Sequence, residues 1–252
     1  MNIARPAIFC VLASSVLFGG CSGSETSGAS VDIGCRLHSD CPVGQLCADT
    51  ECVPDEDACA GDDYPAEIAL VVSNIDGVQG LERAKNAGIP TTVVNHKDFK
   101  SRESFDASMT ETINRFDVDL LCLAGFMRIL SDGFVEYWHD RMINIHPSLL
   151  PDFKGLDVQQ RALDEGVDKS GCTVHYVRSE MDTGPIIVQA EVPIVGGDTA
   201  SELAARILTK EHIIYPTAVK LIAEGRVEIE NELVLIDGEG PPEGGFSPLT
   251  LI

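Results

Sequence analysis

The chain has 252 residues, 44% of them hydrophobic, which is enough for one ordinary core, or for one core with a small appended module. Its formal net charge of −22, from 40 acidic and 18 basic residues, would repel the phosphates of DNA or RNA and argues against nucleic acids as partners. No apolar run reaches the ~20 residues that a membrane-spanning helix needs.

The cysteines divide the chain into two parts. Seven of the nine lie within the first 59 residues, and only Cys122 and Cys172 lie beyond them. A dense group of cysteines is typical of an oxidising compartment, whereas isolated cysteines are typical of a reducing one. The two parts therefore indicate different compartments.

The first 21 residues have the pattern of a bacterial lipoprotein signal. Arg5 gives a positive start, Ala7–Phe18 is a short apolar run, and two glycines precede Cys21, the residue that such signals lipidate. We expect membrane attachment only through this lipid. The alternative is that Ile8–Leu12 forms a buried strand.

Residues 22–63 are expected to form a flexible tether and a small cysteine-rich module. The tether is the Ser/Gly-rich segment Ser22–Ser30. Two disulfides could stabilise the module that follows, which is too short for its own core. Its cysteines are Cys35, Cys41, Cys47 and Cys52. Their pairing does not follow from the sequence, and zinc binding is the alternative, although no CxxC pair is present. An acidic linker, Asp55–Asp63, comes next.

From about residue 64 the pattern changes to alternating strands and helices. Short apolar runs predict strands at Ile68–Val72, Thr91–Asn95, Leu120–Ala124, Met142–Ile145, Thr173–Val177 and Ile186–Ala190. Helices are predicted at Gly80–Gly88, at Arg102–Phe116, around Phe134 and Trp138, and from Asp198 or Thr199 onwards. This alternation predicts an α/β domain with a largely parallel sheet over residues 64–230, followed by a C-terminal extension, 231–252.

Three polar residues lie at strand ends or in loops, the positions where an α/β sheet usually holds its functional residues. Asn144 and His146 lie at the end of a predicted strand, and Asp182 lies in a loop between two later strands. If they converge, His146 and the Asn144 amide can donate to a developing oxyanion, and Asp182 can accept a proton from an attacking amine, directly or through water.

Each of these residues also has an ordinary structural interpretation. His146 could be a capping or core histidine, Asn144 a turn former, and Asp182 an Asx-turn residue. Composition and spacing alone therefore predict an α/β domain and leave its activity open.

Five longer motifs narrow the choice. They are Gly80–Ala84, Leu123–Leu130, Asn144–Pro151, Met181–Ile187 and Glu211–Pro216. Together they resemble phosphoribosylglycinamide formyltransferase, and the resemblance runs from about Tyr64 to Ile229. Two related folate-dependent enzymes, methionyl-tRNA formyltransferase and formyltetrahydrofolate deformylase, share the Asn-x-His and Asp elements but not usually the longer motifs.

The resemblance implies a formyltransferase-type Rossmann-like fold and transfer of a formyl group from 10-formyltetrahydrofolate to glycinamide ribonucleotide in purine synthesis. It implies small-molecule substrates and no metal. By resemblance, the catalytic residues are Asn144, His146 and Asp182. The folate-site residues would be Met127, Arg128, Ile129, Leu130 and Arg102, and Glu211 would meet the substrate ribose. Arg102 and Glu211 could instead be plain helix-surface residues.

The sequence departs from the family pattern at two places. The family begins with a strand, a Gly/Ser/Asn loop that binds the substrate phosphate, and a helix, and we find no such unit before Tyr64. We therefore expect a sheet that lacks its first strand, unless Ile8–Gly20 imitates it. In addition, Asp157-Val158-Gln159 replaces the usual His-Thr-His. Both changes predict weaker activity.

The two parts of the chain therefore lead to competing functions. The enzyme domain indicates a cytoplasmic transferase, and this is the interpretation that we prefer for a functional protein. The N-terminus indicates an exported, membrane-anchored lipoprotein whose formyltransferase-like half is not catalytic. Folate binding without transfer is a third possibility. The sequence does not determine the oligomeric state.

Overall fold

The computed structural model describes residues 7–13, 45–48, 51–54 and 64–251. The proposed lipidation of Cys21, the tether and the pairing of the N-terminal cysteines lie outside these residues or concern side chains that are not described. Within the cysteine-rich segment, β2 (Gln45–Ala48) and β3 (Glu51–Pro54) form a separate antiparallel pair.

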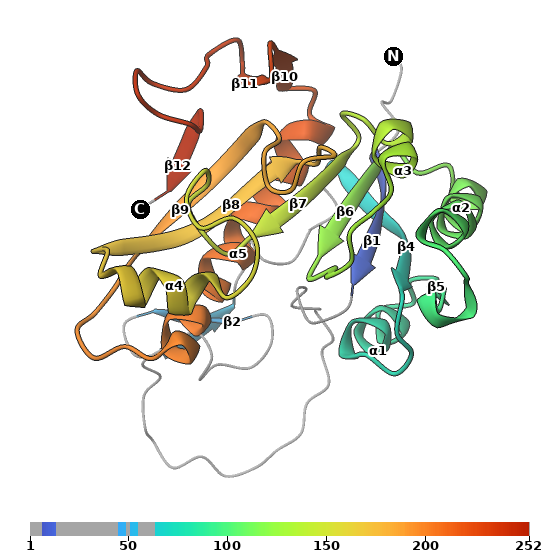
Figure 1. Ribbon diagram of the computed structural model, residues 1–252, viewed down its shortest axis with the longest axis horizontal. Coiled ribbons are helices and arrows are strands. Elements are labelled where there is room, and N and C mark those ends of the chain that lie inside the picture. Colours follow the sequence, from blue (N-terminus) through green and yellow to red (C-terminus); the bar gives the residue numbers. More distant parts are fainter. Residues whose placement is uncertain (1–6, 14–44, 49–50, 55–63, 252) are drawn as a thin grey trace.

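A central sheet of eight strands runs through the domain (Figure 1). Its spatial order is β12-β9-β8-β7-β6-β1-β4-β5. The strands are β1 (Ala7–Ala13), β4 (Ala66–Ser73), β5 (Thr91–Val93), β6 (Leu120–Ala124), β7 (Met142–His146), β8 (Lys169–Tyr176), β9 (Ile186–Pro193) and β12 (Leu249–Leu251). β8 is antiparallel to both of its neighbours and every other adjacent pair is parallel, which confirms the predicted α/β class with a mostly parallel sheet.

The expectation that this sheet lacks its first strand is wrong. β1 lies between β4 and β6 and is parallel to both, with Ala7 opposite Ala66 and Ala13 opposite Ala124. A continuous apolar segment suits a strand that has a neighbour on each side and helices above and below. The alternative of a strand over Ile8–Leu12 is therefore confirmed. The expected absence of the family's loop and helix concerns residues 14–44, which lie outside the described part.

Helices cover both faces of the sheet (Figure 1). They are α1 (Gln79–Asn86), α2 (Arg102–Ile113), α3 (Asp132–Tyr137), α4 (Val158–Glu165) and α5 (Ala200–Ala223), with short 3-10 turns at His96–Asp98 and Asn114–Phe116. Along β7, Ile143 and Ile145 belong to the apolar cluster that includes α5, whereas Met142 belongs to the cluster that includes α2 and α3. Alternate residues of β7 thus point to opposite faces, and two separate cores result.

Capping residues explain where the two longest helices begin. Ser101 accepts a hydrogen bond from the backbone of Ser104 at the start of α2, and Thr199 accepts one from Glu202 at the start of α5. In both cases the third residue of the helix returns a bond to the cap, which satisfies backbone groups that would otherwise lack partners. The predicted starts at Arg102 and Asp198 or Thr199 agree with these caps.

The C-terminal residues add to the domain. β10 (Val227–Glu230) and β11 (Leu233–Ile236) form an antiparallel hairpin that spans the predicted boundary at residue 230, and β12 extends the main sheet beside β9. In the part of the chain that the structure describes, no helix combines the length and the apolar character needed to cross a bilayer.

Candidate active site

The candidate site is built on the carboxyl end of β7. Asn144 and His146 are two residues apart on this strand, so their side chains share one face, opposite the face that carries Ile143 and Ile145. Asn144 is opposite His175 of the antiparallel strand β8. The register therefore places three polar side chains together on one face of the sheet.

Asp182 reaches this face from the loop between β8 and β9. Its Oδ2 lies 3.6 Å from Nδ1 of His146 and accepts a hydrogen bond of 2.9 Å from the backbone N–H of Gly155. The side chains of His146 and Asp182 are only 8% and 10% exposed, so the carboxylate interacts with the imidazole largely out of water. The structure thus brings together the three residues predicted to be catalytic.

His175 is a member of the site that the sequence reasoning missed. Its Nδ1 lies 2.8 Å from the carbonyl oxygen of Tyr176, which can only accept, so Nδ1 carries the proton. Burial lowers the pKa of His175 to about 4, and the ring is therefore neutral near pH 7. Its unprotonated Nε2 then accepts from Nδ2 of Asn144 at 3.3 Å, which fixes the orientation of the amide. The polar residues Thr173 and His175, two apart in an apolar strand, were the available signal.

The other nitrogen of His146 is also engaged. Its Nε2 lies 3.0 Å from the carbonyl oxygen of Phe153, to which it donates, and the hydroxyl of Ser148 donates to the carbonyl oxygen of Asp152 at 2.7 Å. Phe153 has a φ of 52°, in the left-handed region that residues with a side chain rarely adopt. A tightly turned loop after β7 therefore closes over His146.

Buried hydrogen bonds hold this loop against the neighbouring strands. Thr173 Oγ1 donates to the carbonyl oxygen of Ser148 at 2.7 Å and accepts from the backbone N–H of Leu150 at 3.0 Å. Gln189 Nε2 donates to the carbonyl oxygen of Leu150 at 2.9 Å. Because all these groups are buried, each bond that is lost would leave an unsatisfied polar atom. β8 and β9 thus fix the loop that contacts His146.

The predicted folate residues follow β6 and lie partly in solvent. Met127 and Ile129 are 72% and 69% exposed, whereas Leu130 packs on the core cluster that includes α2. The guanidinium of Arg128 lies 5.8 Å from the ring centre of Phe105 on α2. Arg102, at the first turn of the same helix, is about half exposed and lies 3.9 Å from Glu103. These residues surround the end of β6, which neighbours β7.

Glu211, the residue expected to meet the substrate ribose, is a buried carboxyl. It is on α5, buried to 8% exposure, and no hydrogen bond joins it to another group within the described residues. Burial raises the pKa of its carboxyl to about 7. The interpretation of Glu211 as a plain surface residue is therefore wrong.

The substituted motif at residues 157–159 lies at the start of α4. Asp157 precedes the helix with a φ of 55°, and its side chain makes no capping hydrogen bond there. Helix α4 was not predicted, because only Val158 and Ala162 bury apolar side chains along it. Sequence periodicity is weak in so short a segment.

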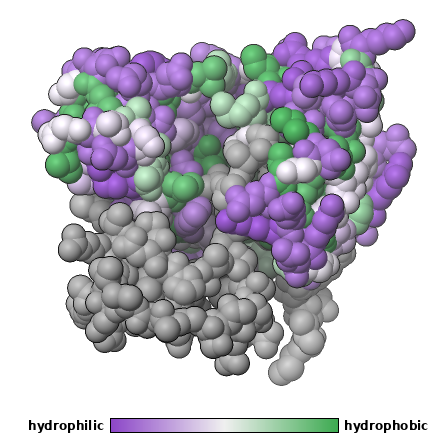
Figure 2. Space-filling model, turned by 90° about the horizontal axis from the view of Figure 1, so that it is seen from below, coloured by the Kyte–Doolittle hydropathy of each residue, from purple (hydrophilic) through white to green (hydrophobic). Residues whose placement is uncertain are grey.

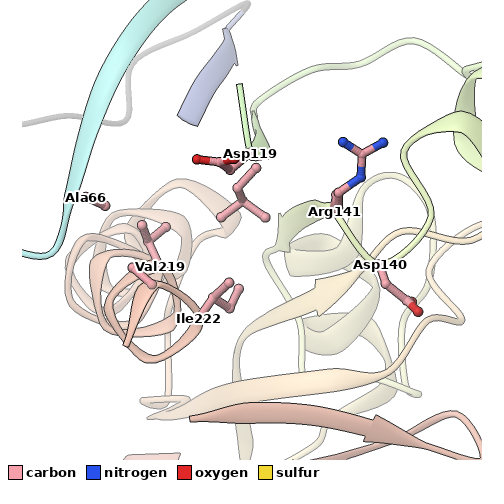
Figure 3. A pocket seen from close by; sticks show the side chains of 8 residues that line it. Ala66, Asp119, Asp140, Arg141, Val219 and Ile222 are labelled. Carbon is pink, nitrogen blue, oxygen red and sulfur yellow. The ribbon is translucent and has the colours of Figure 1, made fainter. Parts of the chain in front are cut away.

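A separate cavity of about 190 Å³ lies at the opposite end of the parallel strands (Figure 3). Its walls include Ala66 and Leu120, the first residues of β4 and β6, together with Val219 of α5. His146 is the last residue of β7, which is parallel to β6, so this cavity is not part of the candidate site.

Seen from below the view of Figure 1, the molecule shows hydrophobic residues among hydrophilic ones around a recess (Figure 2).

No group of three or more His, Cys, Asp or Glu side chains that could hold a metal ion occurs among the described residues. The side chains that converge at the site supply an amide, an imidazole and a carboxylate. Two donors beside a carboxylate suit the attack of an amine on a carbonyl carbon.

Comparison with known proteins places the chain in a family. Residues 52–219 match the family model described as formyl transferase. Phosphoribosylglycinamide formyltransferase of Escherichia coli (strain K12) is 40% identical over 191 residues, which are 76% of this chain and 90% of that protein.

Two further similarities extend this result. The trifunctional purine biosynthetic protein adenosine-3 of Drosophila pseudoobscura pseudoobscura is 55% identical over 168 residues, and the chain spans only 12% of its length. The structure of phosphoribosylglycinamide formyltransferase from Coxiella burnetii superposes with a TM-score of 0.76 at 34% identity and covers 96% of this chain and 99% of that chain. On these matches, the chain belongs to the formyl transferase family.

Proposed function

We propose that the chain transfers the formyl group of 10-formyltetrahydrofolate to the amine of glycinamide ribonucleotide, a step of purine synthesis. The observation that carries the proposal is the convergence of Asn144, His146 and Asp182 on one face of β7. The similarity to enzymes named for this reaction supports the choice of substrates.

The geometry gives each of the three residues a role. The amine nitrogen attacks the formyl carbon, and negative charge develops on the formyl oxygen as the tetrahedral intermediate forms. The carbonyl is restored when the bond to the folate nitrogen breaks, and that nitrogen takes up a proton as it leaves. One N–H of Asn144 donates to His175, which leaves the second N–H for the formyl oxygen. Asp182 accepts the proton that the amine loses, directly or through water.

His146 is the second donor to the formyl oxygen. In the ligand-free arrangement its Nε2 donates to the carbonyl oxygen of Phe153, so the formyl group has to displace this carbonyl. Phe153 has a strained φ of 52°, and this strain would be released if the residue moved to a more common backbone conformation. The strain therefore favours the displacement of its carbonyl. Asp182 faces Nδ1 on the other side of the ring at 3.6 Å and orients the imidazole for this donation.

The remaining residues would bind the two substrates. The exposed side chains of Met127 and Ile129 offer apolar surface to a flat ring, and the backbone of residues 127–130 offers hydrogen bonds. Arg102 and Arg128 are cations near α2 that suit the carboxylates of folate or another substrate anion. The buried carboxyl of Glu211 is available for the ribose hydroxyls.

We further propose that the enzyme works in the cytoplasm. β1 is an interior strand of the sheet, so a folded domain cannot also release this segment as an export signal. This argues against the alternative of an exported lipoprotein with a non-catalytic module.

The test is formyl transfer to glycinamide ribonucleotide by the full chain, compared with Asp182→Asn and His146→Ala. We expect kcat to fall by about 10²–10⁴-fold in each, because a proton acceptor or an oxyanion donor is lost. His212→Ala, on the exposed side of α5, is the matched control and should retain full activity. Transfer that survives Asp182→Asn would remove the proposed role of that residue.

Folate binding without transfer is the second candidate, and the replacement of the family's His-Thr-His by Asp157-Val158-Gln159 favours it. A folded sample that binds a folate analogue saturably but transfers no formyl group would support this candidate over the enzyme.

A further inference from the structure

Arg178 lies at the base of the loop that carries Asp182. It follows β8 by two residues and precedes Asp182 by four. Its guanidinium donates to two carboxylates that come from distant parts of the chain, Asp140 before β7 and Glu232 in the turn of the β10–β11 hairpin. We call these three residues the Arg178 cluster.

All three nitrogens of the Arg178 guanidinium donate hydrogen bonds. Nε and Nη2 of Arg178 donate to the two oxygens of Glu232 at 2.7 and 3.2 Å, Nη2 also donates to Asp140 at 2.8 Å, and Nη1 donates to the carbonyl oxygen of Val177 at 3.2 Å. The side chain is only 13% exposed. A two-pronged bond to a carboxylate fixes direction as well as distance, so the position of this side chain is well defined.

The loop folds back against Arg178. A Cβ added to Gly184 would lie 1.8 Å from the carbonyl oxygen of Tyr176 and 3.3 Å from Cγ of Arg178. The backbone two residues after Asp182 therefore contacts the stem of Arg178. Any movement of Arg178 changes the surface on which the Asp182 loop rests.

The backbone also indicates that external contacts hold this loop. Asp182 has a φ of 54°, and the two acidic residues of the Arg178 cluster, Asp140 and Glu232, have φ values of 55° and 62°. Glycine or asparagine is favoured at such positions, and acidic residues there need compensating contacts. Glu232 forms an ion pair with Arg178, and Asp140 contacts both Arg178 and, at 3.2 Å, Nδ1 of His139.

We propose that Arg178, Asp140 and Glu232 position Asp182 for catalysis, so that the C-terminal hairpin contributes to the active site without touching it. This inference rests on the proposed formyl transfer. Glu232 lies beyond residue 219, where the match to the family model ends, and so belongs to the part of the chain that the model does not cover. Asp140 and Glu232 are positioning residues that act through Arg178.

The hairpin supplies a matched control. Arg226 donates to Asp237 through Nε at 3.0 Å and through Nη2 at 2.6 Å, and Asp237 has a φ of 55°. This pair resembles Arg178–Glu232 in chemistry and backbone, but within the described residues no hydrogen bond or ion pair joins it to the Asp182 loop.

The experiment compares Glu232→Ala with Asp237→Ala in the full chain, by hydrogen exchange of residues 178–185 and by kcat and KM. We expect Glu232→Ala to accelerate exchange in this segment and to lower kcat about 5–10-fold with KM within about twofold, because Asp182 loses its fixed position. Asp237→Ala should leave the hydrogen exchange of residues 178–185 and the value of kcat near those of the wild type. Arg178→Lys should be intermediate, since it keeps the charge and loses the two-pronged bond.

A double-mutant cycle separates positioning from general stability. In an Asp182→Asn background, Glu232→Ala should cause no further loss of the residual rate if Glu232 acts through Asp182. An equal loss in both backgrounds, or exchange no faster than in Asp237→Ala, would overturn the inference. If the wild-type chain transfers no formyl group, the proposed function fails, and hydrogen exchange alone decides whether the Arg178 cluster holds the loop.

Discussion

The amide of Asn144 and the ring of His175 face each other across two antiparallel strands, with Nδ2 and Nε2 3.3 Å apart. This relationship makes His175 the residue that orients a predicted oxyanion donor. It depends on the neutral ring, because an imidazolium would present a donor to the amide nitrogen.

Replacing His175 should therefore affect the rate more than binding. His175→Phe keeps a flat buried ring but removes the acceptor, and we expect kcat to fall about 10-fold, the equivalent of one hydrogen bond. His175→Gln, whose side chain can still accept a hydrogen bond from Asn144, should show a smaller fall in kcat. Steady-state kinetics of the full chain measure this effect, and an unchanged kcat in a folded His175→Phe would show that Asn144 needs no such partner.

Removal of the N-terminal segment should prevent folding. A chain of residues 22–252 lacks β1, which pairs with β4 on one side and β6 on the other. Both strands would then expose unpaired backbone groups in the interior of the sheet. We expect no cooperative urea unfolding transition from this fragment, whereas residues 7–252, which keep the whole strand, should show one. Cooperative unfolding of the shorter fragment would restore the export-signal interpretation.

Gly184 should not tolerate a side chain. A Cβ would lie 1.8 Å from the carbonyl oxygen of Tyr176, which is backbone and cannot rotate away. We expect Gly184→Ala to lower the free energy of unfolding by about 3 kcal/mol. Gly196 has open space around it, and Gly196→Ala should change stability by less than about 1 kcal/mol. Equal stabilities of the two variants in urea would contradict the close approach.

Two buried groups should give opposite pH dependences of stability. Burial raises the pKa of Glu211 from 4.5 to about 7, so its contribution is present below pH 4.5 and is lost as the pH rises through 7. Burial lowers the pKa of His175 from 6.5 to about 4, so its contribution is present above pH 6.5 and is lost as the pH falls through 4. Between pH 4.5 and 6.5 the two effects oppose each other.

Single substitutions should reveal this opposition. Relative to the wild type, Glu211→Gln should make the free energy of unfolding rise with pH by about 1.4 kcal/mol per unit over this range, and His175→Gln should make it fall by a similar amount. Urea unfolding at half-unit pH intervals measures both slopes. Curves that stay parallel to that of the wild type would show that these groups titrate alike in the folded and unfolded states.

Most of the fold could be predicted from local patterns. The strand at Leu120–Ala124 was predicted with its observed bounds, because all five residues are buried and apolar. The helix at Gly80–Gly88 differs from α1 by one or two residues at each end, and Gly88 has the left-handed φ of 72° expected at a helix end. Such elements depend on neighbours in the sequence alone.

The missed elements depend on distant contacts. β12 has three residues and is a strand only because it pairs with β9, more than 50 residues earlier. The sequence of β1 predicts an export signal or a buried strand, because an apolar segment of this length suits either role. Its identity as a strand follows from its two partners, β4 and β6.

The candidate site shows the same division. The three predicted residues were found through long motifs, whereas His175 depends on the register of β8 against β7, which the sequence does not specify. The Arg178 cluster joins residues 38 and 54 positions apart. No local pattern indicates that Asp140 and Glu232 share a partner.

The place of β1 in the middle of the sheet has a consequence for the order of events during synthesis. The segment is made first, yet its partner β6 ends at residue 124, so more than 100 residues must follow before both sides can pair. Until then this apolar segment cannot pair on both of its edges, as is common where strand pairing is non-local. During that interval the unpaired segment is exposed to chaperones and prone to aggregation, and this exposure ends only when β6 has been made and the segment can pair on both sides.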